Sequence, residues 1–120
     1  MRQIGFGLAV LALACGPAVA AGTDDMVGKW QWEGFTIEVT KCAAEAGICA
    51  KVVAGPKNVG MEMIRSKLEP KEGAFVGRIA HPMTADIYNT KLQLTDADSW
   101  KLDGCTDQNV CATGVFKRVK

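Results

Sequence analysis

Cysteine is the most reactive residue type in this chain of 120 residues, and it occurs five times. Cys15 lies in an N-terminal apolar segment that resembles an export signal, which leaves Cys42, Cys49, Cys105 and Cys111. An even number of cysteines in a short exported chain indicates two disulfides, with three connectivities open. Short turn-like segments inside each local pair favour Cys42–Cys49 and Cys105–Cys111. The Cys-x-x-Cys spacing of redox sites is absent, so we expect structural bridges, each worth roughly 2.5 kcal/mol.

Groups suited to catalysis are few. His81 is the only histidine, and no serine stands in a Gly-x-Ser-x-Gly setting. A catalytic triad needs a base beside an activated nucleophile, and cysteines held in disulfides supply none. The acidic pairs Asp96/Asp98 and Glu69/Glu72 fall in turn-like segments, where solvated surface is expected. We therefore expect a protein that is not an enzyme and that needs no cofactor.

Soft-metal binding is the one ligation chemistry that the spacing suggests. Met61 and Met63 are two residues apart and share a face of one predicted strand. His81 and Met83 end the predicted partner strand, and a turn near Lys71 places Met61 opposite His81. Two thioethers and an imidazole suit Cu(I). Core methionines and a surface histidine explain the same pattern, so copper stays a minor alternative and no metal is assigned.

The N-terminal segment, residues 1–20, predicts a cleaved signal peptide. Arg2 provides the positive charge, a short apolar run follows, Pro17 interrupts it, and Ala18-Val19-Ala20 matches the cleavage pattern. The run is too short to span a bilayer, which takes roughly twenty apolar residues, and no later segment qualifies. We expect a periplasmic or secreted protein. A lipoprotein anchored through Cys15 is the alternative.

Charge excludes further classes of partner. Removal of Arg2 from the fourteen basic residues leaves thirteen, which equals the thirteen acidic residues. The two signs are interspersed along the chain, so neither nucleic-acid binding nor electrostatic membrane binding is indicated.

Eight short strands are predicted after the signal. Phe35, Ile37 and Val39 alternate with polar residues, which is typical of a strand with one buried face. Turn signals separate the other segments, for example Glu69-Pro70-Lys71-Glu72-Gly73. The predicted strands cover residues 26–32, 35–41, 48–54, 61–68, 74–81, 86–95, 100–105 and 112–119.

This pattern predicts an all-β fold, a small antiparallel up-and-down β-barrel that forms a single domain over residues 21–120. Pairing of the first and last strands would remove two open edges. An eight-stranded barrel is either filled by side chains or just wide enough for one small ligand, and the sequence does not choose between them. The expected inward residues, and thus the candidates for a ligand pocket, are Phe35, Ile37, Val39, Met61, Met63, Ile79, Leu92, Leu94 and Leu102.

Gly28-Lys29-Trp30 near the start and Arg118 near the end resemble the Gly-x-Trp motif and the late Arg of lipocalins. The resemblance implies that Trp30 packs across the closed end of the barrel beneath Arg118, and that Gly28 is a further structural residue of this closed end. A guanidinium can stack on an indole while it donates to nearby carbonyls.

A fuller pattern is similar to a bacterial family of small secreted, lipocalin-like proteins that carry a domain of unknown function. It adds Phe35-Thr36-Ile37-Glu38-Val39, Lys41-Cys42, Cys49-Ala50-Lys51-Val52-Val53, Gly77-Arg78-Ile79 with Pro82, Tyr88 with Leu92 and Leu94, Leu102-Asp103-Gly104-Cys105, and Cys111 with Phe116-Lys117-Arg118. The resemblance implies a calycin-like barrel in the cell envelope and assigns no catalytic residue. Ala50, Phe116, His81 and the short 54–60 segment depart from the pattern, which leaves any ligand shared with that family undefined.

We therefore predict a non-enzymatic, lipocalin-like periplasmic protein that binds a small apolar or amphipathic ligand inside the barrel. Met-rich linings adapt to varied ligands. The alternative is an envelope module that binds another protein through its surface, for which Trp32 and Tyr88 are candidate exposed aromatics.

Overall fold

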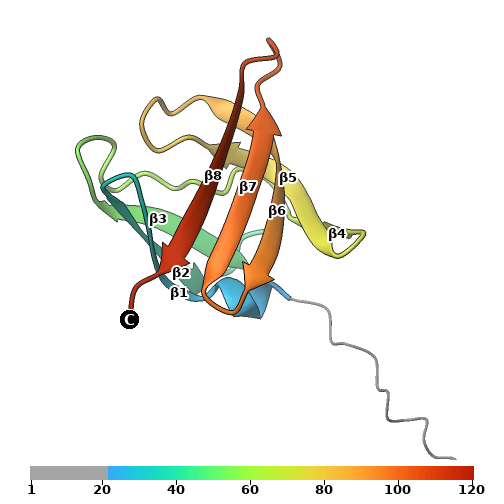
Figure 1. Ribbon diagram of the computed structural model, residues 1–120, viewed down its shortest axis with the longest axis horizontal. Helices are drawn as coiled ribbons and strands as arrows, with labels where there is room; N and C mark the ends of the chain where they lie inside the picture. Colours follow the sequence, from blue (N-terminus) through green and yellow to red (C-terminus); the bar gives the residue numbers. More distant parts are fainter. Residues whose placement is uncertain (1–21) are drawn as a thin grey trace, which may run out of the picture.

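A computed structural model describes residues 22–120 (Figure 1). The predicted signal peptide and Cys15 lie outside this part of the chain. A short 3-10 helix, η2 (Thr23–Met26), precedes eight strands. The strands are β1 (Gly28–Trp32), β2 (Phe35–Lys41), β3 (Ile48–Ala54), β4 (Glu69–Lys71), β5 (Ala74–Ala80), β6 (Ile87–Asp96), β7 (Ser99–Cys105) and β8 (Cys111–Arg118). No helix within 22–120 is long and apolar enough to cross a membrane.

All eight strands belong to one curled antiparallel sheet with the order β3-β2-β1-β8-β7-β6-β5-β4. The all-β prediction and the meander are therefore confirmed. The first and last strands pair, with Trp30 opposite Arg118 and Gln31 opposite Lys117. Because β1 and β8 meet, the open edges of the sheet fall at β3 and β4, in the middle of the chain.

The predicted strand over 61–68 is wrong, and so is the five-residue turn after it. Only Glu69–Lys71 forms a strand, β4, and the turn to β5 consists of Glu72 and Gly73, both with positive φ. The segment before β4 does not lie along one partner, because it crosses the gap between β3 and β5 and pairs with each in turn through single bridges.

Alternating backbone hydrogen bonds hold this crossing segment. The N–H of Met63 donates to the carbonyl of Ala50 on β3 at 2.7 Å. The carbonyl of Met63 in turn accepts from the N–H of Ala80 on β5 at 2.7 Å. Residue 63 thus ties β3 to β5, and the segment closes the half-barrel that the eight strands leave open.

A carboxylate completes the pairing where the crossing segment is irregular. Glu62 Oε2 accepts from the N–H of Ala50 at 2.7 Å and from the N–H of Ile64 at 3.0 Å. Two backbone donors that a regular strand partner would satisfy are bonded to this side chain instead, which matters because a buried unpaired N–H is costly.

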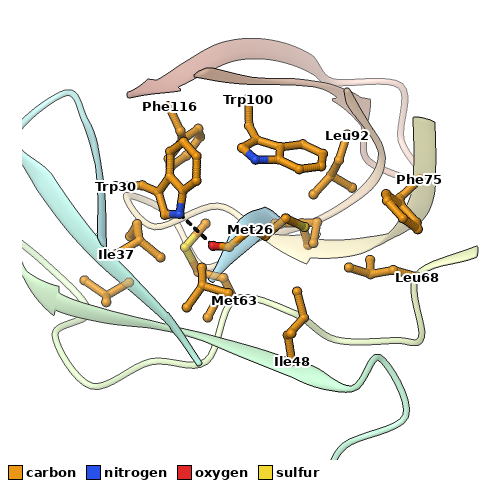
Figure 2. Close-up of a cluster of buried hydrophobic side chains, with 14 of the residues drawn as sticks. Met26, Trp30, Ile37, Ile48, Met63, Leu68, Phe75, Leu92, Trp100 and Phe116 are labelled. Carbon is orange, nitrogen blue, oxygen red and sulfur yellow. Dashed lines mark hydrogen bonds between the residues drawn. The ribbon is translucent and has the colours of Figure 1, made fainter. Parts of the chain in front are cut away.

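The interior of the barrel is packed by the inward faces of the strands (Figure 2). Along β2 the buried residues are Phe35, Ile37 and Val39, as the alternation predicts. Ile79 and Leu92 are also buried, whereas Leu94 and Leu102 are half-buried against the core. The remaining buried core residues are Met26, Trp30, Ile48, Ala50, Val52, Met63, Leu68, Ala74, Phe75, Ala80, Trp100 and Phe116.

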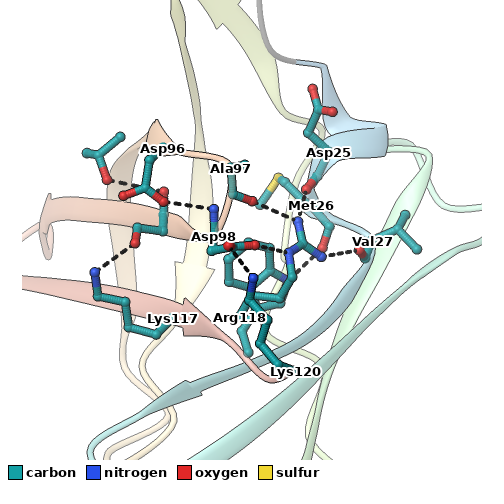
Figure 3. A network of polar contacts seen from close by, with 12 residues as sticks. Asp25, Met26, Val27, Asp96, Ala97, Asp98, Lys117, Arg118 and Lys120 are labelled. Atoms are coloured by element: carbon teal, nitrogen blue, oxygen red, sulfur yellow. Dashed lines mark hydrogen bonds and ion pairs between the residues drawn. The ribbon is translucent and has the colours of Figure 1, made fainter.

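Helix η2 covers one end of the barrel (Figure 1). Trp30 and Arg118 lie together at this end, and Figure 3 shows Arg118 beside η2. Trp30 is buried, and its Nε1 donates to the carbonyl of Met26 at 2.8 Å. The guanidinium carbon of Arg118 lies 4.3 Å from the centre of the indole. Gly28 allows this approach, because a Cβ there would lie 2.6 Å from Arg118 Nη1.

The guanidinium also makes four hydrogen bonds (Figure 3). It donates to the carbonyls of Val27 at 3.0 Å, Asp25 at 3.0 Å and Ala97 at 3.2 Å, and to Asp98 Oδ1 at 3.1 Å. A hydrogen bond from Lys120 lowers the pKa of Asp98, and Arg118 adds to this effect. One side chain therefore joins η2, the start of β1, the β6–β7 turn and β8.

Two disulfides pin the turns of the sheet, with the predicted pairing Cys42–Cys49 and Cys105–Cys111. The first joins the ends of the β2–β3 connection, and the second joins the β7–β8 connection. Both bridges are local and strengthen turns that strand pairing already closes.

Two substitutions of Trp30 separate its packing from its hydrogen bond. Trp30→Phe keeps an aromatic ring but loses the bond to the Met26 carbonyl, so we expect a loss of about 1–2 kcal/mol. Trp30→Ala removes the ring beneath Arg118 and should cost about 3–5 kcal/mol. Urea denaturation of both variants measures the two losses. A fully stable Trp30→Ala protein would contradict this account of the closed end.

Candidate functional site

Four aromatic rings meet at the end of the barrel away from η2, and we call Trp32, His81, Tyr88 and Phe116 the aromatic mouth. Trp32 stacks on Phe116 with centroids 5.5 Å apart and meets His81 edge-on at 5.3 Å. His81 lies 5.6 Å from Tyr88. Phe116 is buried, whereas the other three rings are half-buried, so they line a site that solvent reaches.

Strand register explains why these rings meet. Trp30 pairs with Arg118, and the same antiparallel register continued by two residues brings Trp32 beside Phe116. On the other side, Ile79 pairs with Tyr88, and His81 follows directly after β5. The mouth is therefore built from the ends of strands that are far apart in sequence.

The wall beneath the mouth is made of small residues. Gly104, Ala112 and Gly114 line a cavity of about 50 Å³ together with the four rings of the mouth. A Cβ at Gly114 would lie 2.7 Å from Nε1 of Trp32. Gly114 thus lets the indole lie against β8, and any larger residue there would push Trp32 outwards.

His81 is held as a neutral hydrogen-bond donor. Its Nδ1 accepts from the N–H of Met83 at 3.1 Å, which leaves the ring proton on Nε2. Burial lowers the pKa of His81, and the nearby Asp86 opposes this shift only in part. Backbone bonds from His81 N–H to the Asp86 carbonyl and from Ala85 N–H to the His81 carbonyl fix the turn that carries the ring.

A second, inner cavity of about 40 Å³ lies in the core. Its lining is apolar except for the indole N–H groups of Trp30 and Trp100. Trp100 is 2% exposed, and its Nε1 has no hydrogen-bond partner among residues 22–120. Such a buried unsatisfied donor costs about 1–3 kcal/mol.

The two cavities share part of their walls, because Met63, Ile79, Leu102 and Phe116 line both. At about 50 Å³ and about 40 Å³ they are small, since pockets for drug-sized ligands measure roughly 300–1,000 Å³. The barrel is therefore mostly filled by side chains, and the space that remains fits one ring or a short chain rather than a large ligand.

The residues expected from the sequence to line a pocket divide into two groups. Ile37, Val39, Met63, Ile79, Leu92 and Leu102 line the inner cavity, and Met63, Ile79 and Leu102 line the outer one too. Phe35, Met61 and Leu94 line neither of these two cavities. Sequence reasoning considered Trp32 and Tyr88 only as isolated surface aromatics and missed Phe116 and Trp100 as lining residues. Only the strand register brings them together.

The residues considered for copper are partly separated. Met63 and His81 line the outer cavity, but Met61 pairs with Val52 of β3 through its backbone. Met83 is 38% exposed, and its N–H occupies the Nδ1 atom of His81. No group of three His, Cys, Asp or Glu residues that could hold a metal ion occurs within 22–120.

Comparison of the chain with protein-family models, with curated proteins and with solved structures finds no match. The resemblance to secreted lipocalin-like proteins stays an expectation, and the function is argued from the geometry of the two cavities.

The lowered pKa of His81 predicts a pH dependence of folding. Above about 6.5, the ordinary pKa of the unfolded side chain, the stabilisation of neutral His81 is fully present. This stabilisation is lost as the pH falls from about 6.5 through the lower pKa of His81 in the folded state. In that range the unfolded chain binds a proton that the folded protein does not yet bind. Urea denaturation between about pH 5.5 and about pH 7.5 should show this decline.

The matched control is His81→Gln, which keeps a polar side chain but does not titrate. Because His81 is the only histidine, the variant should have a flatter stability profile over this range. Equal slopes for the variant and the natural protein would contradict the prediction.

Proposed function

We propose that this protein is an exported, non-enzymatic, lipocalin-like binding protein that takes a small apolar or amphipathic ligand at the aromatic mouth. One observation carries the proposal: three half-buried rings and Phe116 surround a cavity that opens to solvent at the end of the barrel opposite η2. Aromatic side chains bind apolar groups with a large contact area and a preferred geometry.

The polar groups of the mouth support a ligand of mixed character. The pairing of His81 Nδ1 with Met83 leaves Nε2–H as a donor. The cavity lining contains no Lys, Arg, Asp or Glu side chain. An ion would lose its hydration there without gaining a partner, so a neutral ligand or the apolar part of an amphipathic one is favoured.

The same geometry gives little support to catalysis. A nucleophile–base pair would need His81 beside an activated Ser or Cys, but no Ser lines the outer cavity. All four cysteines within 22–120 are paired in disulfides, so no thiolate is at hand. The proposal therefore assigns His81 a binding role.

Export is part of the proposal because of two features. Both disulfides suit an oxidising compartment outside the cytoplasm. The N-terminal sequence adds the signal-peptide pattern described above. We propose the periplasm or the medium as the location.

A second candidate function is binding of another envelope protein through the same mouth. The small volume of the cavities favours it, because an apolar side chain of a partner fits such a space as well as a free ligand does. Trp32 and Tyr88 would then act as the half-exposed anchors typical of protein interfaces.

Native mass spectrometry of the protein purified from its own cells without refolding distinguishes these functions. An added mass of up to a few hundred daltons that is lost on denaturation supports a carried ligand. A copper-sized increment supports the Cu(I) alternative with Met61, Met63 and His81. A mass equal to the processed chain with two disulfides, together with co-purification of one defined protein, supports the second candidate.

Trp32→Ala tests the mouth directly. We expect it to weaken binding of the neutral apolar dye N-phenyl-1-naphthylamine, whose phenyl ring would enter the mouth while its naphthyl group stays outside, about tenfold, the effect of losing roughly 1.4 kcal/mol of contact. Fluorescence titration of the dye gives the dissociation constants.

Val115→Ala is the matched control. Val115 is on β8 beside Gly114, is 42% exposed and lines neither cavity. The control should bind the dye as the natural protein does. If both variants lose affinity equally, or neither does, the dye does not bind at the mouth and the proposal fails.

A further inference from the structure

The unpartnered indole N–H of Trp100 is the polar feature of the core that the proposed function leaves unused. It lies on β7, is 2% exposed and lines the inner cavity. Figure 2 shows its nitrogen on the edge of the ring that faces Trp30 and Met26 in the middle of the core. Buried indole donors usually have an acceptor, so this one marks a specific place for an acceptor atom.

We propose that the inner cavity is the deep end of the ligand site, and that Trp100 Nε1–H donates a hydrogen bond to a carbonyl or ether oxygen of the ligand. This inference rests on the proposed function, because the ligand enters through the aromatic mouth. It narrows the ligand class to small, neutral molecules with an apolar body and one acceptor oxygen.

The other two tryptophans show why Trp100 is different. Trp30 Nε1 is also in the core, but it donates to the Met26 carbonyl at 2.8 Å. Trp32 is half-buried at the mouth, where solvent reaches the ring. Among residues 22–120, Trp100 Nε1 is the one buried side-chain nitrogen or oxygen without a hydrogen-bond partner.

The lining of the inner cavity indicates what kind of group completes this bond. Its side chains, apart from the indoles of Trp30 and Trp100, are hydrocarbon or thioether groups, and the Trp30 N–H is already bonded to the Met26 carbonyl. A buried water needs two to four polar partners, and one N–H does not hold it well. A carboxylate is disfavoured because no cation lines the cavity. A neutral oxygen on an apolar molecule would accept the Trp100 hydrogen bond, and the rest of the molecule would pack against the apolar lining.

The shared wall of the two cavities is the place where a ligand would pass from the mouth to the inner cavity. Met63 lines both cavities, and its unbranched side chain changes rotamer easily. Phe116 belongs to the mouth and lines the inner cavity as well. A movement of Met63 would join the two spaces into one slot that runs from Trp32 to Trp100.

The test uses a pair of probes with the same shape, cyclohexanone and methylenecyclohexane, which differ by an oxygen in place of a CH₂ group. The chain has three tryptophans, so a ¹H–¹⁵N spectrum of the naturally processed protein has three indole N–H signals. We expect saturating cyclohexanone to shift the Trp100 signal downfield, as a new hydrogen bond requires. Methylenecyclohexane should produce no downfield shift, and cyclohexanone should bind about tenfold more tightly.

Other outcomes separate the two proposals. If both probes shift only the Trp32 signal, the mouth binds ligands but the inner cavity does not, and this inference is overturned while the proposed function stands. If neither probe changes any indole signal or binds, the proposed function fails for small neutral ligands, and the inference fails with it. Shifts of the Trp100 signal that are the same for both probes also overturn the hydrogen bond.

Trp100→Phe is the companion variant. It keeps an aromatic ring on β7 but removes the donor, so its preference for cyclohexanone over methylenecyclohexane should disappear. A variant that folds and keeps the tenfold preference would contradict the inference. If Trp100→Phe does not fold, assignment of the Trp100 indole signal by through-space contacts to Phe75, whose ring centre lies 6.4 Å from that of Trp100, keeps the measurement on the natural protein decisive.

Discussion

The contact of Arg118 with Trp30 is the interaction on which the rest of this barrel depends. It joins the last strand to the first, and the guanidinium binds three carbonyls and one carboxylate from segments that are otherwise far apart. Because Trp30 and Arg118 are also partners in the β1–β8 ladder, the contact fixes the register of that pair. A slip of one residue would turn both side chains to the opposite face of the sheet.

The geometry of the aromatic mouth, the proposed binding site, depends on this register. Two residues beyond Trp30, Trp32 lies on Phe116 and against Gly114 because β1 and β8 are aligned in this way. The contact at the closed end therefore fixes the positions of the rings at the mouth, although Trp30 and Arg118 are not themselves part of the mouth. The crossing segment joins β3 to β5 through the backbone of Met63, and Glu62 adds a bond to Ala50 on β3. Met63 is at the same time a wall of both cavities. Closure of the barrel and formation of the site use the same residues.

Much of the fold could be predicted because local signals agree with it. The alternation of Phe35, Ile37 and Val39 and the Cys42–Cys49 pair define β2 and β3 with the bounds that the structure has. The stretch 61–68 could not be predicted, since its apolar pattern resembles that of a strand while its backbone pairs with two different strands. The substitution of the Glu62 carboxylate for a backbone partner has no sequence signal, because any exposed glutamate looks the same in the sequence.

The candidate site was harder to predict than the fold for a related reason. Trp32, Tyr88 and Phe116 are ordinary strand aromatics when each is considered alone, and only long-range register makes them neighbours. Trp100 raises the opposite problem. Its apolar surroundings are those expected of a core residue, yet an indole buried without an acceptor disagrees with the rule that buried polar groups are paired. In natural proteins such local disagreements gather at functional sites, where stability is given up for binding. A phenylalanine would fill this position without the cost of an unpaired donor, and the ligand oxygen that we propose for the inner cavity gives the indole its acceptor.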